Sequence, residues 1–192
     1  MAPGSSHNLS TEARQTLLTV ARRSIEHGLR QGSPLPTPLD HYPDTLRRKR
    51  ATFVTLKQGE QLRGCIGTLE AIRPLVQDVA HNAYAAAFSD PRFPPLSREE
   101  LDGVRIEISV LSPPQPIHFD SEADLIRQLR PGIDGLILEE RGHRGTFLPS
   151  VWESLPHPQQ FLQHLKLKAG LPPNYWSDTV RVERYTTESF GE

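Results

Sequence analysis

The fold of this chain is decided around residues 62–69, which read Leu62-Arg63-Gly64-Cys65-Ile66-Gly67-Thr68-Leu69. The run predicts a β-strand that carries the only cysteine of the 192 residues between two glycines. Glycine weakens a strand interior, so this pair indicates a close approach by a ligand or by another backbone. Because side chains two apart on a strand share a face, Arg63, Cys65 and Gly67 are expected to project together.

Two interpretations of Cys65 stay open from the residues alone. An arginine beside a thiol favours the thiolate, and the missing side chain of Gly67 leaves room to reach the sulfur. Against this, a free cysteine often acts as a small buried hydrophobe, and strand glycines often mark only a bulge.

The segments around this strand predict two helices and a hairpin in the first half of the chain. Residues 51–56 are a second β-rich run, joined to 62–69 by a turn at 57–60. Ser10 is a helix N-cap, and apolar residues at helical spacing continue to Gly32. Pro74 begins another helix, which 89–91 end.

The second half mixes strands and helices in the same way. Ser97 and Glu100 form a capping box. The further predicted elements are a strand over 104–110, a helix from Ser121 to Pro131-Gly132, a hairpin of 136–138 with 145–148, a helix from Pro158 to Gly170, and a strand over 179–185. This order predicts an α+β fold with mainly antiparallel sheets and flanking helices.

Charge and composition exclude several classes of protein. Lysine and arginine number 22 against 23 aspartates and glutamates, a balance that argues against nucleic-acid or membrane-surface binding. The one basic run, 47–50, is interpreted as solvated. No apolar run reaches membrane length, and residues 1–7 lack the features of a signal peptide. We therefore expect a cytoplasmic protein with no nucleic acid and no membrane as partners.

The sequence offers no recognisable metal or nucleotide motif. It has no second cysteine and no histidine pair at i, i+4, so we expect no metal site; His157 and His164 are interpreted as surface residues. No phosphate-binding glycine loop follows a strand, and any cofactor stays unknown. A cysteine nucleophile needs a base nearby, and the eight histidines do not identify one.

Two further clusters could belong to a site with Cys65. Asp90, Arg92 and Phe93 share a proline-fixed turn suited to orienting a polar ligand, although a local ion pair would also explain the first two. Glu107 and Ser109 lie on the strand face opposite the apolar stripe of 104–110, where solvent exposure is the ordinary explanation. If that face lines a site with Arg63 and Cys65, Glu107 becomes a proton-transfer or ligand-orienting group.

The chain resembles the AMMECR family in five runs that occur in the family's order. They are Ala51-Thr52-Phe53-Val54-Thr55-Leu56, residues 62–69, Ala86-Ala87-Phe88-Ser89-Asp90-Pro91-Arg92-Phe93, Ile106-Glu107-Ile108-Ser109-Val110-Leu111 and Gly145-Thr146-Phe147-Leu148-Pro149. The resemblance implies one domain over 10–186, made of two unequal interlocked lobes with a cleft near the cysteine, and flexible termini at 1–9 and 187–192. It also implies association with a Memo-like protein and a radical SAM protein, as in the AmmeMemoRadiSam system.

The leading hypothesis is an enzyme that uses Cys65 as a thiolate nucleophile or redox thiol. The candidate catalytic residues are Cys65, Arg63 and Glu107; the candidate ligand-binding residues are Gly64, Gly67, Asp90, Arg92, Phe93 and Ser109. The alternative is a non-catalytic adaptor that holds a small molecule or peptide for a partner protein. Because the family has no settled activity, the resemblance indicates the fold better than the function.

Overall fold

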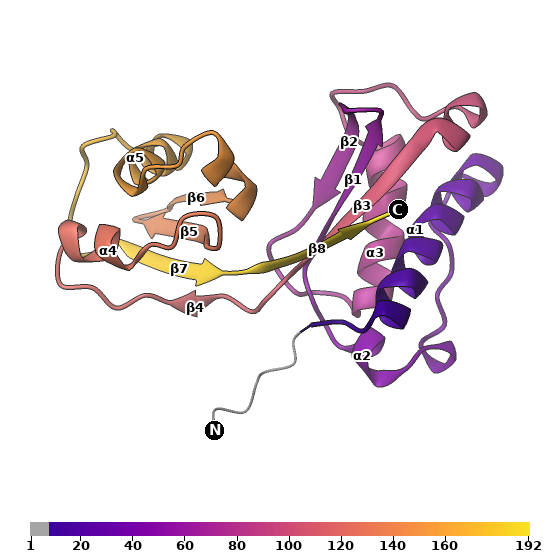
Figure 1. Ribbon diagram of the computed structural model, residues 1–192, viewed down its shortest axis with the longest axis horizontal. Helices are drawn as coiled ribbons and strands as arrows, with labels where there is room; N and C mark the ends of the chain where they lie inside the picture. The colour runs from indigo at the N-terminus through magenta and orange to yellow at the C-terminus, as the bar shows by residue number, and fades with distance from the viewer. Residues whose placement is uncertain (1–7) are drawn as a thin grey trace. The chain divides into compact units, whose positions relative to one another are not determined.

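The computed structural model describes residues 8–192, which form helices and two sheets of four strands each (Figure 1). The expected α+β class is confirmed. The chain divides into two compact units. The first unit comprises the residues up to Leu111 together with Glu188–Glu192, and the second comprises Ser112–Thr187.

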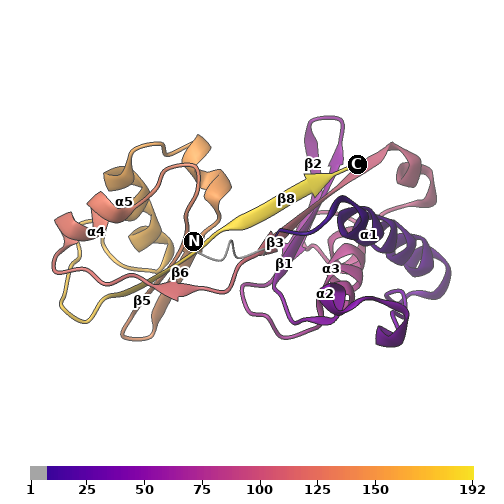
Figure 2. The same ribbon diagram turned by 60° about the horizontal axis from the view of Figure 1, so that its bottom comes forward.

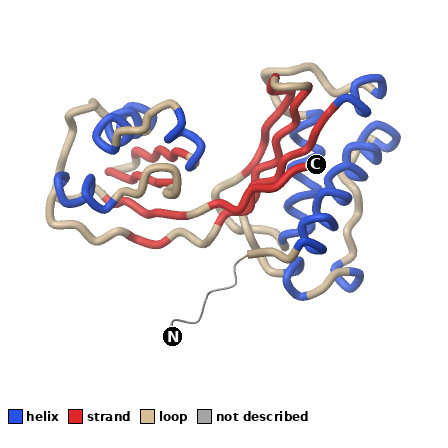
Figure 3. The backbone as a smooth tube through the Cα atoms, in the orientation of Figure 1, coloured by secondary structure: helices blue, strands red, loops and turns tan. Residues whose placement is uncertain are grey.

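The sheet of the first unit has the strand order β2-β1-β3-β8, and β1 pairs antiparallel with both β2 and β3. Its helices lie on one side of the strands, as Figures 2 and 3 show. The elements are α1 (Thr11–Gln31), η1 (Leu39–His41), α2 (Asp44–Arg47), β1 (Thr52–Gln58), β2 (Gln61–Gly67), α3 (Leu75–Phe88), η2 (Arg98–Gly103), β3 (Val104–Leu111) and β8 (Thr187–Gly191).

Local chemistry explains where α1 begins and ends. The Ser10 hydroxyl accepts the Ala13 N–H at 3.0 Å, which satisfies one of the helix's unpaired donors. Gly32 ends the helix with a φ of 71°, the left-handed conformation that glycine adopts without strain. Both boundaries match the sequence prediction.

Register gives the first sheet two different faces. Val54, Leu56, Ile106 and Ile108 belong to the core that α1 and α3 cover. On the opposite face Thr55 pairs in register with both Cys65 and Glu107, so these three form one row across β2, β1 and β3. Strand alternation therefore places the side chains of Thr55, Cys65 and Glu107 on the face away from the helices.

The second unit packs two helices on a sheet of order β4-β7-β5-β6. Its core combines aliphatic side chains with a ring stack, in which the centroids of Trp152 and Phe161 lie 3.7 Å apart. The elements are β4 (Gln115–Pro116), α4 (Glu122–Gln128), β5 (Gly135–Glu140), β6 (His143–Phe147), η3 (Pro149–Glu153), α5 (Pro158–Lys168) and β7 (Arg181–Tyr185).

The end of the chain differs from the expectation of a flexible terminus. Residues 187–191 form β8, and three of the side chains that follow Thr187 are anchored. Glu188 pairs with Arg14 at 2.6 Å, Phe190 packs against the core, and Glu192 pairs with Arg22 at 2.6 Å. At the other end, most of the segment expected to be flexible, residues 1–7, lies outside the described residues.

Among residues 8–192, none of the helices combines the length and the apolar character that crossing a membrane requires.

Candidate functional site

Cys65 occupies a partly exposed position on β2 and makes two polar contacts. Its Sγ lies 3.2 Å from the Thr55 hydroxyl on the neighbouring strand. Its backbone N–H donates to the Asp90 carboxylate at 3.0 Å. β2 is an edge strand, so this N–H points away from β1 and would otherwise lack a partner from the sheet.

Asp90 connects the backbone of Cys65 to a guanidinium group. Its side chain is only 2% exposed and also accepts the Arg92 backbone N–H at 3.1 Å. Arg92 donates to the same carboxylate from Nε at 3.1 Å and from Nη2 at 2.8 Å. The hydrogen bonds from Arg92 hold the pKa of Asp90 far below its usual value, with the backbone N–H groups adding to the effect. Asp90 is therefore ionised at neutral pH.

Arg92 is fixed at one edge and open at the other. Its side chain remains 56% exposed, and its guanidinium carbon lies 5.4 Å from the centre of the Phe93 ring. The structure thus brings Asp90, Arg92 and Phe93 together, and it joins this turn to Cys65 through one hydrogen bond.

Arg63 does not project with Cys65, contrary to the strand-parity argument. The pairing of β1 with β2 shifts between Leu56 and Lys57, so Leu56 faces Gly64 while Lys57 faces Leu62. Arg63 is the extra residue of this bulge, which breaks the alternation of side chains.

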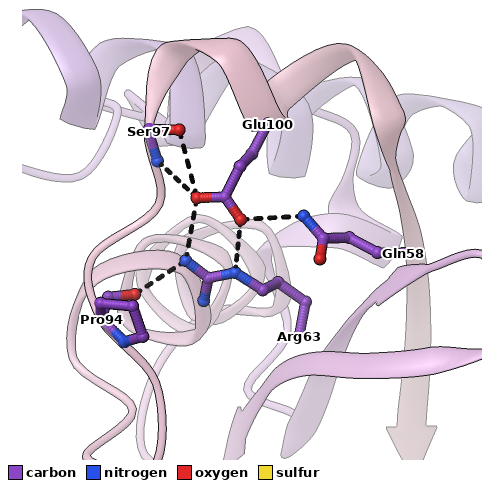
Figure 4. A network of polar contacts seen from close by, with 5 residues as sticks. All are labelled: Gln58, Arg63, Pro94, Ser97 and Glu100. Atoms are coloured by element: carbon purple, nitrogen blue, oxygen red, sulfur yellow. Dashed lines mark hydrogen bonds and ion pairs between the residues drawn. The ribbon is translucent and has the colours of Figure 1, made fainter.

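The Arg63 side chain is instead buried in a polar network on the side of η2, shown in Figure 4. It donates to Glu100 at 2.7 and 3.2 Å and to the Pro94 carbonyl at 2.8 Å. Glu100 also accepts from Gln58 at 2.8 Å and completes the predicted capping box with Ser97. The Arg63 contacts, followed by those of Ser97 and Gln58, lower the pKa of Glu100 to about 2.

Glu107 and Ser109 lie on the same sheet face as Cys65 but have other partners. Glu107 pairs with Lys57 at 3.2 Å, and the Ser109 hydroxyl lies 2.8 Å from that of Ser189. Two strand spacings separate Glu107 from Cys65, roughly 10 Å, which is too far for direct proton transfer to the thiol.

Both motif glycines have a packing reason to lack a side chain. A Cβ on Gly64 would collide with the carbonyl oxygen of Ala86 in α3, and one on Gly67 would collide with the Phe53 ring and the Thr52 carbonyl. The sequence indicated a close approach by a ligand or by another backbone. At Gly64 it is the backbone of Ala86 that comes close. Ligand access is not needed to explain either residue.

The polar partners of Cys65 in the described part of the chain are Thr55 and Asp90, and no histidine is among them. No group of three His, Cys, Asp or Glu side chains within residues 8–192 is arranged to hold a metal ion. The polar groups gathered at this site are the thiol, the Thr55 hydroxyl, the buried Asp90 carboxylate and the exposed Arg92 guanidinium.

Sequence reasoning missed Thr55, whose hydroxyl is the side-chain group that hydrogen-bonds to the thiol. The signal was present, since the hairpin register around the turn at 57–60 places position 55 near position 65. Lys57 and Ser189, which engage Glu107 and Ser109, were also missed.

The second unit has a groove of its own, and no cysteine is among the residues that line it. Its volume is about 710 Å³, and it runs along β7. The acidic residues that line it are Asp120, Asp124, Glu139, Asp178 and Glu183.

Comparison with known proteins places this arrangement in a family. A protein of Methanothermobacter thermautotrophicus is 42% identical over 190 residues, covering 96% of each chain. Protein MJ0810 of Methanocaldococcus jannaschii is 38% identical over 162 residues, covering 80% of this chain and 79% of the relative.

A solved structure supports the same relationship. The crystal structure of the uncharacterised protein PH0010 from Pyrococcus horikoshii matches with a TM-score of 0.82 and 38% identity, over 92% of this chain and 90% of that one. The sequence profile of the AMMECR1 family matches residues 18–190, which include every site residue described above. The chain therefore belongs to the AMMECR1 family.

Proposed function

We propose that this protein is an enzyme in which the Cys65 sulfur is the nucleophile. The observation that supports this most directly is the fixed setting of a partly exposed thiol, 3.2 Å from the Thr55 hydroxyl and anchored through its own N–H to buried Asp90. A cysteine that acts only as a small hydrophobe would not need the contact with the Thr55 hydroxyl.

The proposed step is attack by the thiolate on an electrophilic carbon of the substrate. A carbon–sulfur bond forms as the bond to the leaving group breaks, and the leaving group takes the electron pair. The thiol proton passes to solvent, and the Thr55 hydroxyl then donates to the thiolate sulfur. Arg92 supplies a positive charge near the reacting atoms, the role that the sequence had given to Arg63.

The setting proposed for this activity is the cytoplasm, where reducing conditions keep a single thiol free. Partnership with a Memo-like and a radical SAM protein is proposed from the family resemblance alone. Purification of a tagged chain together with both partners, followed by mass spectrometry, tests it; absence of both from the purified material would remove this part of the proposal.

The test of the nucleophile is the rate at which iodoacetamide alkylates the native protein at neutral pH, read by intact mass. We expect Cys65 to react faster than the neutral thiol N-acetylcysteinamide. Thr55→Val removes the hydroxyl but keeps the shape and strand propensity, and should slow the reaction by about fivefold, the equivalent of one hydrogen bond.

Ser109→Ala is the matched control, because it removes a hydroxyl from the same sheet face that contacts Ser189 instead of the thiol. Its alkylation rate should equal that of the natural protein. Alkylation slower than the reference thiol, and unchanged by Thr55→Val, would reject the nucleophile and favour the adaptor.

A further inference from the structure

The Arg92 guanidinium has one edge occupied and one edge open. Asp90 takes the edge formed by Nε and Nη2, where its two oxygens lie 3.1 and 2.8 Å away. A guanidinium carries five N–H donors in a planar fork, so the edge formed by Nη1 and Nη2 can accept a second planar anion. The 56% exposure of the Arg92 side chain leaves this fork accessible to solvent.

Asp90 holds this fork next to the backbone of Cys65. Oxygen Oδ2 of Asp90 accepts from Cys65 N at 3.0 Å and from Arg92 Nη2 at 2.8 Å, so one atom links the two groups. The carboxylate is almost completely buried and cannot itself meet an incoming molecule. Its charge orients Arg92 while the guanidinium faces outward.

Three cationic side chains lie on the sheet face of Cys65 or in the turn that contacts it. Lys57 and Arg105 are partners in register and project from the sheet face that carries the thiol, and Glu107 on the same face pairs with Lys57. Together with Arg92 these give three cations and one anion at the surface. Such an excess attracts anions to the site.

We infer that the molecule that meets Cys65 carries an oxyanion, a carboxylate or phosphate, and that Arg92 binds it through its open edge. This inference rests on the proposed function, because it names the chemical class of that site's substrate. Phe93 lies under the guanidinium and supports its plane. Arg92 is then the residue that determines specificity.

The first test compares two alkylating reagents that differ in charge. Iodoacetate is anionic and iodoacetamide is neutral, and both react with the thiolate, so the ratio of their rates cancels the intrinsic reactivity of Cys65. Relative to the ratio for N-acetylcysteinamide, we expect a rise of at least about threefold at low ionic strength, lost at high salt.

Arg92→Gln should return the ratio to the reference value while keeping an N–H donor for Asp90. Arg23→Gln is the charge-matched control, because Arg23 is exposed on α1 in the helix layer, and it should leave the ratio raised. A wild-type ratio equal to the reference, or a raised ratio that Arg92→Gln does not lower, overturns the inference.

A second measurement does not depend on thiol reactivity. In the Cys65→Ser protein, the NMR signal of the Arg92 Nε–H is followed during separate titrations with inorganic phosphate and with acetate. A saturable shift in either titration supports the anion site even if Cys65 fails to react, and the pair of titrations distinguishes phosphate from carboxylate. If the signal shifts in neither titration, the inference is overturned. The proposal that Cys65 is a nucleophile is then still decided by its alkylation rate.

Discussion

The two units both place helices against one face of a sheet, but they use side chains of different size to do so. In the first unit the C-terminal half of α3 contributes small residues to the core, among them Ala83, Ala86 and Ala87, and Ala86 lies against β2. In the second unit the large rings of Trp152 and Phe161 stack between the elements.

This difference bears on where the site lies. Small side chains let α3 approach β2 so closely that the Ala86 carbonyl occupies the space of a Cβ on Gly64. Asp90 follows α3 by two residues, and the close approach brings its carboxylate to the Cys65 N–H. Packing density in the first unit therefore positions the polar contacts of the thiol.

The largest expected effect concerns the ring stack in the core of the second unit. Phe161→Ala should lower the free energy of unfolding by about 4 kcal/mol, because the cavity left between rings collapses only in part. Both tryptophans, Trp152 and Trp176, lie in the second unit, so their fluorescence in urea measures this unit. Leu167→Ala on the same helix, half exposed, is the control and should change little. Equal losses in the two variants would contradict the role given to the stack.

The next effect breaks the close approach in the first unit. Gly64→Ala places a Cβ against the Ala86 carbonyl, and we expect a loss of about 3 kcal/mol, since a backbone atom cannot move aside. Gly103→Ala has open space around the new Cβ and should be nearly neutral. Urea unfolding followed by circular dichroism measures both. If Gly64→Ala behaves like Gly103→Ala, close packing does not hold β2 in place.

Arg63→Met tests the buried polar network beside the site. Removing the guanidinium leaves Glu100 without its ion pair, at an expected cost of about 2 kcal/mol at pH 7. The pKa of Glu100 is about 2 in the native protein against an ordinary value of 4.5. Its contribution to stability is therefore present above pH 4.5 and disappears as the pH falls toward 2.

The stability difference between natural protein and Arg63→Met should accordingly shrink across that interval. Arg127→Met, which removes an exposed partner of Asp124, is a suitable comparison and should show little loss at pH 7. A difference that stays constant from pH 7 to pH 2 would show that Arg63 acts by packing rather than by its charge.

The smallest effect concerns Glu107. Its ion pair with Lys57 is exposed, so Glu107→Gln should change the free energy of unfolding by less than about 1 kcal/mol. The iodoacetamide rate of Cys65 should also stay within a factor of two, roughly, because the two groups are two strands apart. A large fall in that rate with stability unchanged would restore Glu107 as a catalytic group.

Sequence patterns predicted most of the elements because their signals are local. Ser10 and Gly32 mark α1 through contacts made within a few residues, and the alternation in 104–110 predicted β3. β8 was missed because the partners of Glu188 and Glu192, which are Arg14 and Arg22, lie far away in the chain.

Sequence patterns offered candidate residues for the site but did not predict how those residues are arranged. The turn of Asp90 and Arg92 contacts the backbone of Cys65 through Asp90, and its role in orienting a ligand stays a prediction. Strand parity misplaced Arg63 because a bulge depends on pairing between strands, which a single strand's sequence does not reveal. The roles of the two glycines likewise depend on Ala86 and Phe53, which only the packed structure brings near them.

The pairing of β8 with the first sheet has a consequence for how the chain is made. All of Ser112–Thr187 is translated between β3 and the residues Glu188–Glu192 that pair beside it. During synthesis the second unit can therefore fold before Arg14, Arg22 and the outer edge of β3 have partners, because those partners lie in residues 187–192. Until then the nascent first unit has an exposed strand edge, which could pair with strands of other chains.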